Sequence, residues 1–326
     1  MQGKEASEQE TKAKSNVGID VGKHWLDVHV LPGNERLRIA NSCQGIRQLK
    51  RWLTRFDLAL IVVEATGKWH RHVQRSLAAS GIRVALVDPF RVRIFAKAQR
   101  ILAKTDRLDA KVLASFAAIM TPPVRPAAPE ALAELAELVT TRLGAVEAQT
   151  VLKNERSAAM FKSVQRHLDR RIERGDKDIE ALDAAIMKRI EADPALARRY
   201  AILTSIPSFG FVTAAVLIAC LAELGSITNK ASAMLAGLAP IADQSGTREG
   251  LRVIFGGRPR VRRILYLAAL SAARFNADMR AFYGRLRAAG KAPKVALIAI
   301  ARKLVILANT LISEDRLWRR EALNYA

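Results

Sequence analysis

Cysteine is nearly absent from this chain. Its 326 residues include only two, Cys43 and Cys220, and neither belongs to a CxxC pair. Isolated cysteines of this kind predict reduced core thiols in a cytosolic protein and exclude a disulfide framework. The GxxxxGK[ST] motif is missing too, which argues against a P-loop nucleotide hydrolase.

A long uncharged apolar run is also missing. The segment 211–224 is too short to span a bilayer, and the segment 295–312 carries Arg302 and Lys303 at its centre. Both are predicted to be buried helices, and no membrane partner is expected. Residues 1–16 are polar and charge-balanced, without the apolar core of a signal peptide, so we expect a flexible tail there.

Acidic residues are few relative to basic ones. The chain has 53 Lys and Arg against 31 Asp and Glu, a formal net charge of +22. This excess predicts a polyanionic partner, and nucleic acid is favoured over a membrane because no basic amphipathic segment ends in a lipid anchor. Aromatic residues make up only 6% of the chain, so stacking of bases on aromatic rings is not expected to dominate binding.

The first third of the chain alternates between strand and helix patterns. Apolar patterns and turn residues predict strands at 17–21, 24–31, 36–40, 58–63 and 82–87, of which 58–63 is a continuous aliphatic run. Helices are predicted at 44–56, from the turn at 65–67 to 77, at 89–98 and from 106 to about 120. Thr105 is the expected N-cap of the last helix. Three consecutive strands followed by helix–strand alternation are typical of a ribonuclease-H-type α/β fold.

A proline-rich segment ends this domain, with prolines at 122, 123, 126 and 129. From 130 to 190, apolar residues at helical spacing predict two long helices in an antiparallel or dimerising coiled coil, with a turn at Arg174-Gly175-Asp176. A mostly α-helical region follows. The expected domains are therefore a tail at 1–16, an α/β catalytic domain at 17–125, a coiled coil at 129–192 and a C-terminal domain at 195–326.

Four acidic residues stand where the predicted elements begin or end. Asp20 lies in a buried apolar strand, Glu64 ends the central strand, and Asp106 and Asp109 share a face of one helix. Four neighbouring carboxylates repel one another unless Mg²⁺ or Mn²⁺ compensates their charge. Two such ions about 4 Å apart assist phosphodiester displacement. An Asp-x-x-Asp pair alone is usually a solvated helix face, but its combination with two strand-end acids in a basic chain favours a metal site.

A second set of residues is basic and surrounds one serine. Ten arginines and only two acids lie between Arg248 and Arg287, which predicts a phosphate-binding surface. Its candidate nucleic-acid ligands are Arg248, Arg252, Arg258, Arg260, Arg262 and Arg263. Ser245 precedes a glycine in the adjoining polar loop, where arginines could neutralise a developing charge if it attacked a phosphodiester. From the residues alone, it is better interpreted as a turn serine.

Taken together and in order, several motifs resemble the DEDD transposases of bacterial insertion sequences, which are described as bridge-RNA-guided recombinases. The resemblance covers almost the whole chain and rests on Gly18-Ile19-Asp20, Glu64-Ala65-Thr66-Gly67, Lys104-Thr105-Asp106 with Asp109-Ala110, Ile206-Pro207 with Gly210, Ala236-Gly237-Leu238 with Pro240, Ser245-Gly246, and Arg262-Arg263 with Leu265-Tyr266. The chain departs from the family pattern at Ser208, where a glycine is common, and at Asp88, where an asparagine is common.

The resemblance implies a RuvC-like N-terminal domain, a coiled coil and a C-terminal transposase domain. It implies that Asp20, Glu64, Asp106 and Asp109 are catalytic metal ligands for Mg²⁺ (or Mn²⁺) and that Ser245 is a nucleophile that forms a phosphoserine bond with DNA. It also implies a site shared between protomers, hence a dimer or tetramer, together with donor and target DNA and a structured non-coding guide RNA. Such a protein would act in the bacterial cytoplasm, at the nucleoid.

Other functions fit parts of the same pattern. The main alternative is a RuvC-like, Mg²⁺-dependent, structure-specific DNA endonuclease that uses the same acids to activate water. A nucleic-acid scaffold with structural acids is a second alternative. A sugar-kinase or actin-like fold also begins with a Gly-Ile-Asp-x-Gly strand, but it leaves the basic charge unexplained. Charge does not tell RNA from DNA.

Overall fold

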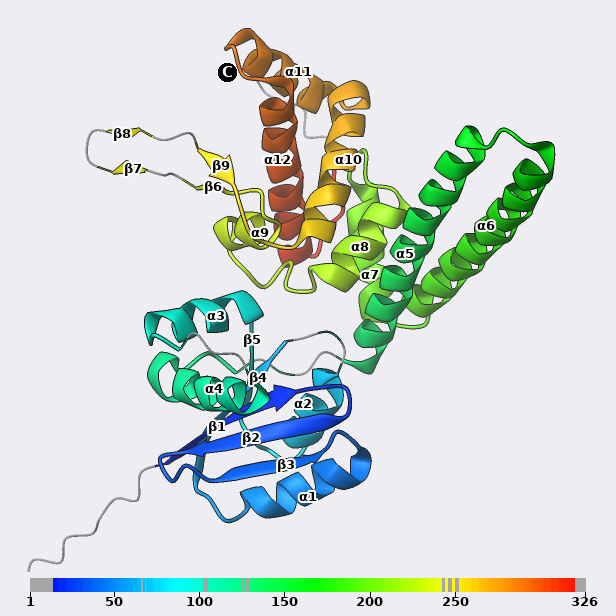
Figure 1. Ribbon diagram of the computed structural model, residues 1–326. Coiled ribbons are helices and arrows are strands. Elements are labelled where there is room, and N and C mark those ends of the chain that lie inside the picture. The colour runs from blue at the N-terminus through cyan, green and yellow to red at the C-terminus, as the bar shows by residue number, and fades with distance from the viewer. Residues whose placement is uncertain are drawn as a thin grey trace, which may run out of the picture. The chain divides into compact units, whose positions relative to one another are not determined.

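The computed structural model describes residues 14–319 except 66, 68, 102–104, 125, 127–128, 242–243, 246–247 and 250–251. Within it the chain divides into two compact units, Met1–Ala128 and Pro129–Ala326. The first is a mixed sheet with helices on both faces, and the second is built mainly of helices (Figure 1). Most of the predicted tail, residues 1–13, lies outside the described residues, whereas Ser15 and Asn16 already belong to the first strand.

The sheet of the first unit has five strands in the order β3-β2-β1-β4-β5. They are β1 (Ser15–Val21), β2 (Trp25–Leu31), β3 (Arg36–Ala40), β4 (Leu58–Glu64) and β5 (Val84–Val87). Strand β2 is antiparallel to β1 and β3, while β4 is parallel to β1 and β5. The three-stranded start and the two later strands confirm the strands predicted from the apolar patterns.

Two pairs of helices cover the two faces of this sheet. Helices α1 (Cys43–Leu53) and α2 (His70–Ala78) pack on the face that carries Val17 and Ile19. Helices α3 (Pro89–Ala98) and α4 (Asp106–Met120) pack on the face that carries Leu60 and Val62. Because side chains alternate along a strand, this second face also receives Gly18 and Asp20 of β1.

Gly18 lets α4 rest directly on β1. A Cβ atom at this position would lie 2.1 Å from the Ala110 carbonyl oxygen and 2.3 Å from the Ala114 nitrogen, which no larger residue could tolerate. The start of α4 is fixed by Thr105, whose hydroxyl accepts a hydrogen bond from the Leu108 N–H at 3.3 Å. The first turn of α4 is thereby held over the end of β1 that carries Asp20.

The second unit begins with two long antiparallel helices, α5 (Glu130–Ala158) and α6 (Lys162–Glu191). Two ion pairs link them, Arg142–Asp183 at 2.7 Å and Arg156–Asp169 at 2.6 Å. The later residue of α5 pairs with the earlier residue of α6, as antiparallel helices require. The predicted turn at 174–176 is wrong, because these residues lie inside α6 and the chain turns at 159–161 instead. Gly175 serves packing: a Cβ there would lie 3.0 Å from the Gln149 side chain.

The remaining helices pack around one core, which also includes residues from the start of α5 and the end of α6. They are α7 (Pro194–Ser205), α8 (Phe211–Cys220), α9 (Asn229–Leu235), α10 (Pro259–Phe275), α11 (Ala277–Ala288) and α12 (Pro293–Ser313). Among the described residues, α12 is the one helix long and apolar enough to cross a membrane, but half of it is buried. Leu304 and Val305 are fully enclosed, which confirms the predicted core helix.

A narrow β-hairpin extends from this unit between α9 and α10 (Figure 1). Strand β6 (Pro240–Ile241) pairs with β9 (Val253–Ile254), and β7 (Gln244–Ser245) pairs with β8 (Arg248–Glu249), both antiparallel. The sequence predicted only a polar loop here, because strands of two residues are too short to show a period. Ser245 therefore stands near the end of a paired arm.

Candidate active site

Asp20 and Glu64 lie at the carboxyl ends of neighbouring parallel strands. The register pairs Ile19 of β1 with Val63 of β4, so the two acids follow at matching positions. Their neighbours Ile19 and Val63 face α1 and α2. Because side chains alternate along a strand, Asp20 and Glu64 lie on the opposite face, which α3 and α4 cover. The strand order thus brings together two residues that are 44 positions apart in the sequence.

Asp106 and Asp109 reach the same region from the first turn of α4. Their carboxylates are favourable at a helix N-terminus, where free N–H groups carry partial positive charge. The contact of α4 with β1 at Gly18 sets this turn beside Asp20. The four acids singled out from the sequence therefore converge on one end of one sheet face.

The electrostatic effect of this convergence falls on Asp20. The pKa of its carboxyl is raised from 3.8 to about 6. Burial is the largest cause, and the charges of Asp109, Asp106, Glu64 and Asp27 contribute in that order. Each of the three other predicted ligands is therefore close enough to oppose the ionisation of Asp20. Negative charge therefore accumulates around Asp20.

Asp27 and Arg38 belong to the site but were missed from the sequence. Asp27 of β2 pairs directly with Asp20 across the strands and is only 6% exposed. Arg38 of β3 uses one nitrogen, Nη2, to contact Asp27 at 3.4 Å and Asp106 at 3.3 Å. The available signal was Asp27 itself, an acid in the largely apolar strand β2. That it lies beside Asp20 and Arg38 follows only from the sheet register.

The donor set suits a hard divalent cation, because all of its side chains offer carboxylate oxygens. Among the residues that the structure describes, however, no three His, Cys, Asp or Glu side chains stand close enough together to hold an ion as they are arranged. One acid, Asp106, is engaged by Arg38. The acids thus influence one another electrostatically, but among the described residues they are not arranged around one common metal position.

Ser245 lies in β7, where its register partner is Arg248 of β8. The side chains of both residues fall outside what the structure describes, as do Gly246 and Thr247. The acid cluster belongs to the first unit and this arm to the second. The prediction that Ser245 is a nucleophile therefore remains untested by the geometry.

Two of the predicted nucleic-acid ligands are partly buried and bonded to neighbouring segments of the chain. Arg258 donates to both carboxylate oxygens of Glu223, at 2.6 and 2.5 Å, and to the Cys220 carbonyl at 2.9 Å. Arg262 donates to the Gly256 carbonyl at 2.6 Å. Both contacts tie the residues at the start of α10 to neighbouring segments, which is a structural task that sequence alone did not reveal.

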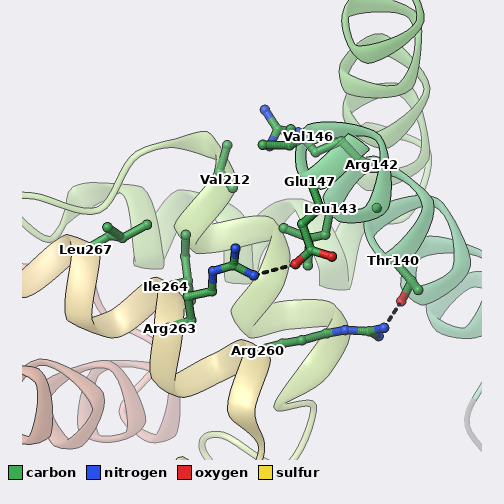
Figure 2. Close-up of a pocket in the computed structure, with 11 residues that line it drawn as sticks. Thr140, Arg142, Leu143, Val146, Glu147, Val212, Arg260, Arg263, Ile264 and Leu267 are labelled. Carbon is green, nitrogen blue, oxygen red and sulfur yellow. Dashed lines mark hydrogen bonds and ion pairs between the residues drawn. The ribbon is translucent and has the colours of Figure 1, made fainter. Parts of the chain in front are cut away.

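Three other predicted ligands are accessible. Arg252 is exposed beside β9. Arg260 and Arg263 extend from α10 toward α5, where they contact Thr140 and Glu147 respectively (Figure 2). These side chains remain the better candidates for phosphate contacts.

The prediction of core thiols is wrong for Cys43. It is exposed in the first turn of α1, ahead of the apolar stripe formed by Ile46, Leu49 and Leu53, and its Sγ lies 3.4 Å from His72 Nε2. Cys220 is partly buried at the end of α8, and burial raises the pKa of its thiol.

Comparison with known proteins points to one family. A family model described as a DEDD transposase of IS110 type matches residues 17–163, and a model described as transposase IS116/IS110/IS902 family matches residues 200–284. Together they cover well over half of the chain. The first match contains all four predicted acids, and the second contains Ser245 and the arginines of α10.

Similar proteins carry related names. A pilin gene-inverting protein of Moraxella bovis is 28% identical over 315 residues, which is 93% of this chain and 97% of that protein. The pilin gene-inverting protein of Moraxella lacunata shows the same identity and coverage. A 43.6 kDa protein of the insertion element IS110 from Streptomyces coelicolor is 35% identical over 127 residues, 38% of this chain and 30% of that protein. With both family models matched in chain order, this protein is a DNA transposase and recombinase that belongs to the IS110 family.

Proposed function

We propose that the protein cuts and rejoins DNA through a covalent bond between Ser245 and a DNA phosphate, assisted by divalent metal bound at Asp20, Glu64, Asp106 and Asp109. The observation that carries this proposal is the convergence of the four acids on one sheet face, where three of them raise the pKa of the fourth. A first unit of ribonuclease-H type, RuvC-like in its strand order, would account for that placement.

The residues fit Mg²⁺ or Mn²⁺ by their chemistry, since all donors are carboxylate oxygens and the charges of the other acids raise the pKa of Asp20. When bound, such an ion stabilises the attacking and leaving oxygens of a phosphodiester. The protein's own contribution is to hold the acids in place: β1 and β4 position Asp20 and Glu64, and the capped first turn of α4 positions Asp106 and Asp109. Arg38 would release Asp106 as the cluster closes.

Ser245 would act from the paired arm of the second unit. Its hydroxyl attacks phosphorus, its proton leaves to solvent or a carboxylate, and one deoxyribose oxygen departs while the phosphate stays bonded to Ser245. Because the phosphodiester energy is kept in that bond, rejoining needs no nucleotide cofactor. We further propose that the serine and the acids come from different protomers of a dimer or tetramer, that a structured guide RNA selects the donor and target DNA, and that the protein works in the bacterial cytoplasm at the nucleoid.

Covalent trapping tests this proposal. Wild-type protein incubated with its element's DNA and Mg²⁺, then denatured, should retain DNA attached to the peptide that contains Ser245. Ser245→Ala should abolish that adduct and excision while DNA binding is retained. Ser226→Ala, at an exposed serine of the same unit, serves as the matched control and should trap DNA normally.

The main alternative is hydrolysis, in which the acids activate water and Ser245 is a bystander. Free 5′-phosphate ends with no attached protein, produced equally by wild type and Ser245→Ala, would establish that alternative. Normal recombination by Ser245→Ala would likewise end the serine assignment.

A further inference from the structure

A pocket of about 230 Å³ lies in the second unit where α5, α8 and α10 meet. Figure 2 shows α10 on one side, with Arg260 and Arg263 extending toward α5. Five apolar side chains contribute to the lining: Leu143, Val146, Val212, Ile264 and Leu267. Leu267 is 53% exposed, so the apolar lining is open to a partner.

The charged residues of this pocket differ in how firmly they are held. Arg142 is fixed by two hydrogen bonds to Asp183, at 2.7 and 3.2 Å. Arg263 pairs with Glu147, but both side chains are more than half exposed, so this ion pair stabilises the fold little and can be exchanged for another anion. Arg260 donates to the Thr140 hydroxyl, a neutral acceptor, at 3.1 Å. Two cations therefore stand at the rim of an apolar pocket.

Gly144 is the third feature of the pocket. It lies in the middle of the 29-residue helix α5, where glycine weakens a helix relative to alanine. A Cβ atom there would meet nothing within 4 Å, and the backbone is helical, so neither packing within the chain nor a turn requires glycine. By contrast, Gly175 of α6 leaves room for Gln149. The missing side chain at 144 widens the pocket on the α5 side.

We infer that this pocket receives one unstacked nucleobase of a single-stranded segment, with the adjoining phosphates on Arg260 and Arg263. The inference rests on the proposed function, in which strands are separated and exchanged. An apolar surface beside guanidinium groups matches a base and its phosphate, since bases pack on aliphatic side chains and on guanidinium planes. The +22 charge of the chain and its family's action on DNA favour a nucleotide over an apolar peptide.

Filling the pocket tests the inference. Gly144→Leu would place a side chain in the space meant for the base, while the helix should be at least as stable as before. Gly284→Leu is the matched control: Gly284 is an exposed glycine of α11 whose Cβ would also meet nothing within 4 Å, and it does not line the pocket. Thermal unfolding of both variants should match or exceed that of wild type.

Binding is measured by fluorescence anisotropy with the full-length protein in EDTA, so that no strand is cut and the result does not depend on Ser245 chemistry. The probes are oligothymidine of about 12 nucleotides, an abasic strand of equal length, the RNA counterpart, and a duplex. Wild type and Gly284→Leu should bind oligothymidine more tightly than the abasic strand. Gly144→Leu should lose about fivefold or more on oligothymidine, on its RNA counterpart or on both, with little change on the abasic strand or the duplex.

The RNA probe tells which strand uses the pocket: a loss confined to RNA assigns it to the guide, and a loss confined to oligothymidine assigns it to DNA. Either result supports the inference. Equal affinity of Gly144→Leu and wild type for every single-stranded probe would overturn it. An equal loss on all probes would also overturn it, because the substitution would then weaken binding whether or not a base is present. A change in oligomeric state would overturn it as well, because the pocket would then lie between protomers.

Discussion

Replacing Asp20 with asparagine should stabilise the folded protein while abolishing recombination. In the native state the Asp20 carboxylate is partly buried among Asp109, Asp106, Glu64 and Asp27, which is why its pKa rises to about 6. Asparagine keeps the size and polarity of the side chain but carries no charge. The variant therefore removes the electrostatic repulsion together with a proposed metal ligand, as expected where a site sacrifices stability for function.

The magnitude follows from the pKa. A rise from 3.8 to about 6 corresponds to about 3 kcal/mol at a pH well above both values. Asp20 is only partly buried, so solvent screening reduces this figure, and we expect a gain of about 1–2 kcal/mol at pH 7 in the absence of divalent metal. Asp57→Asn, at an exposed acid of the same unit, should change stability by less than about 0.5 kcal/mol.

The stability difference between Asp20→Asn and wild type should depend on pH. Because the folded pKa is raised, ionised Asp20 weakens the fold, and the weakening develops as the pH rises from about 4 to about 6. The stability advantage of Asp20→Asn should therefore be absent near pH 3.5, grow through this window and stay constant above it. Urea unfolding across that pH range measures it. If Asp20→Asn were less stable than wild type at pH 7, or if its advantage did not depend on pH, the Asp20 carboxylate would not weaken the fold.

Other predictions concern the residues around this cluster and the second core. Gly18→Ala should destabilise the first unit by about 1–3 kcal/mol or more, seen as a lower melting temperature, because the new Cβ collides with the Ala110 carbonyl. Arg38→Gln should cost roughly 1–3 kcal/mol in urea unfolding, because buried Asp27 loses its charged partner; unchanged stability would show that the contact is incidental. Asn309→Leu should cost roughly 2–3 kcal/mol, since this buried amide makes three hydrogen bonds, and an equally stable variant would disprove that role.

Structural features that depend on residues close together in the chain were predictable from the sequence. The strands from β1 to β5 follow from apolar alternation or, for β4, from a continuous apolar run. Helix α4 begins at the position that Thr105 and Asp106 indicate. Asp20 and Glu64 could be expected to meet because each ends or interrupts an apolar strand. These features depend on residues within one element or at its ends, so a single sequence contains their signal.

Features that depend on pairing between distant elements were not predictable. Asp27 is part of the cluster because the β1–β2 register sets it opposite Asp20, and Arg38 joins it through the β2–β3 register. Gly175 suggested a turn, but its role is set by Gln149 on another helix. Arg258 was predicted to bind nucleic acid, but it contacts Glu223, a residue 35 positions earlier in the chain.

Anomalous diffraction at the manganese edge, from crystals of the protein soaked in Mn²⁺, shows whether the four acids bind divalent ions. We expect at least one manganese ion coordinated by a carboxylate oxygen of Asp20 and by Glu64, Asp106 or Asp109. Its anomalous peak should be lost in Asp20→Asn. Manganese bound only elsewhere in the chain, or a peak at this site that persists in Asp20→Asn, would contradict this expectation.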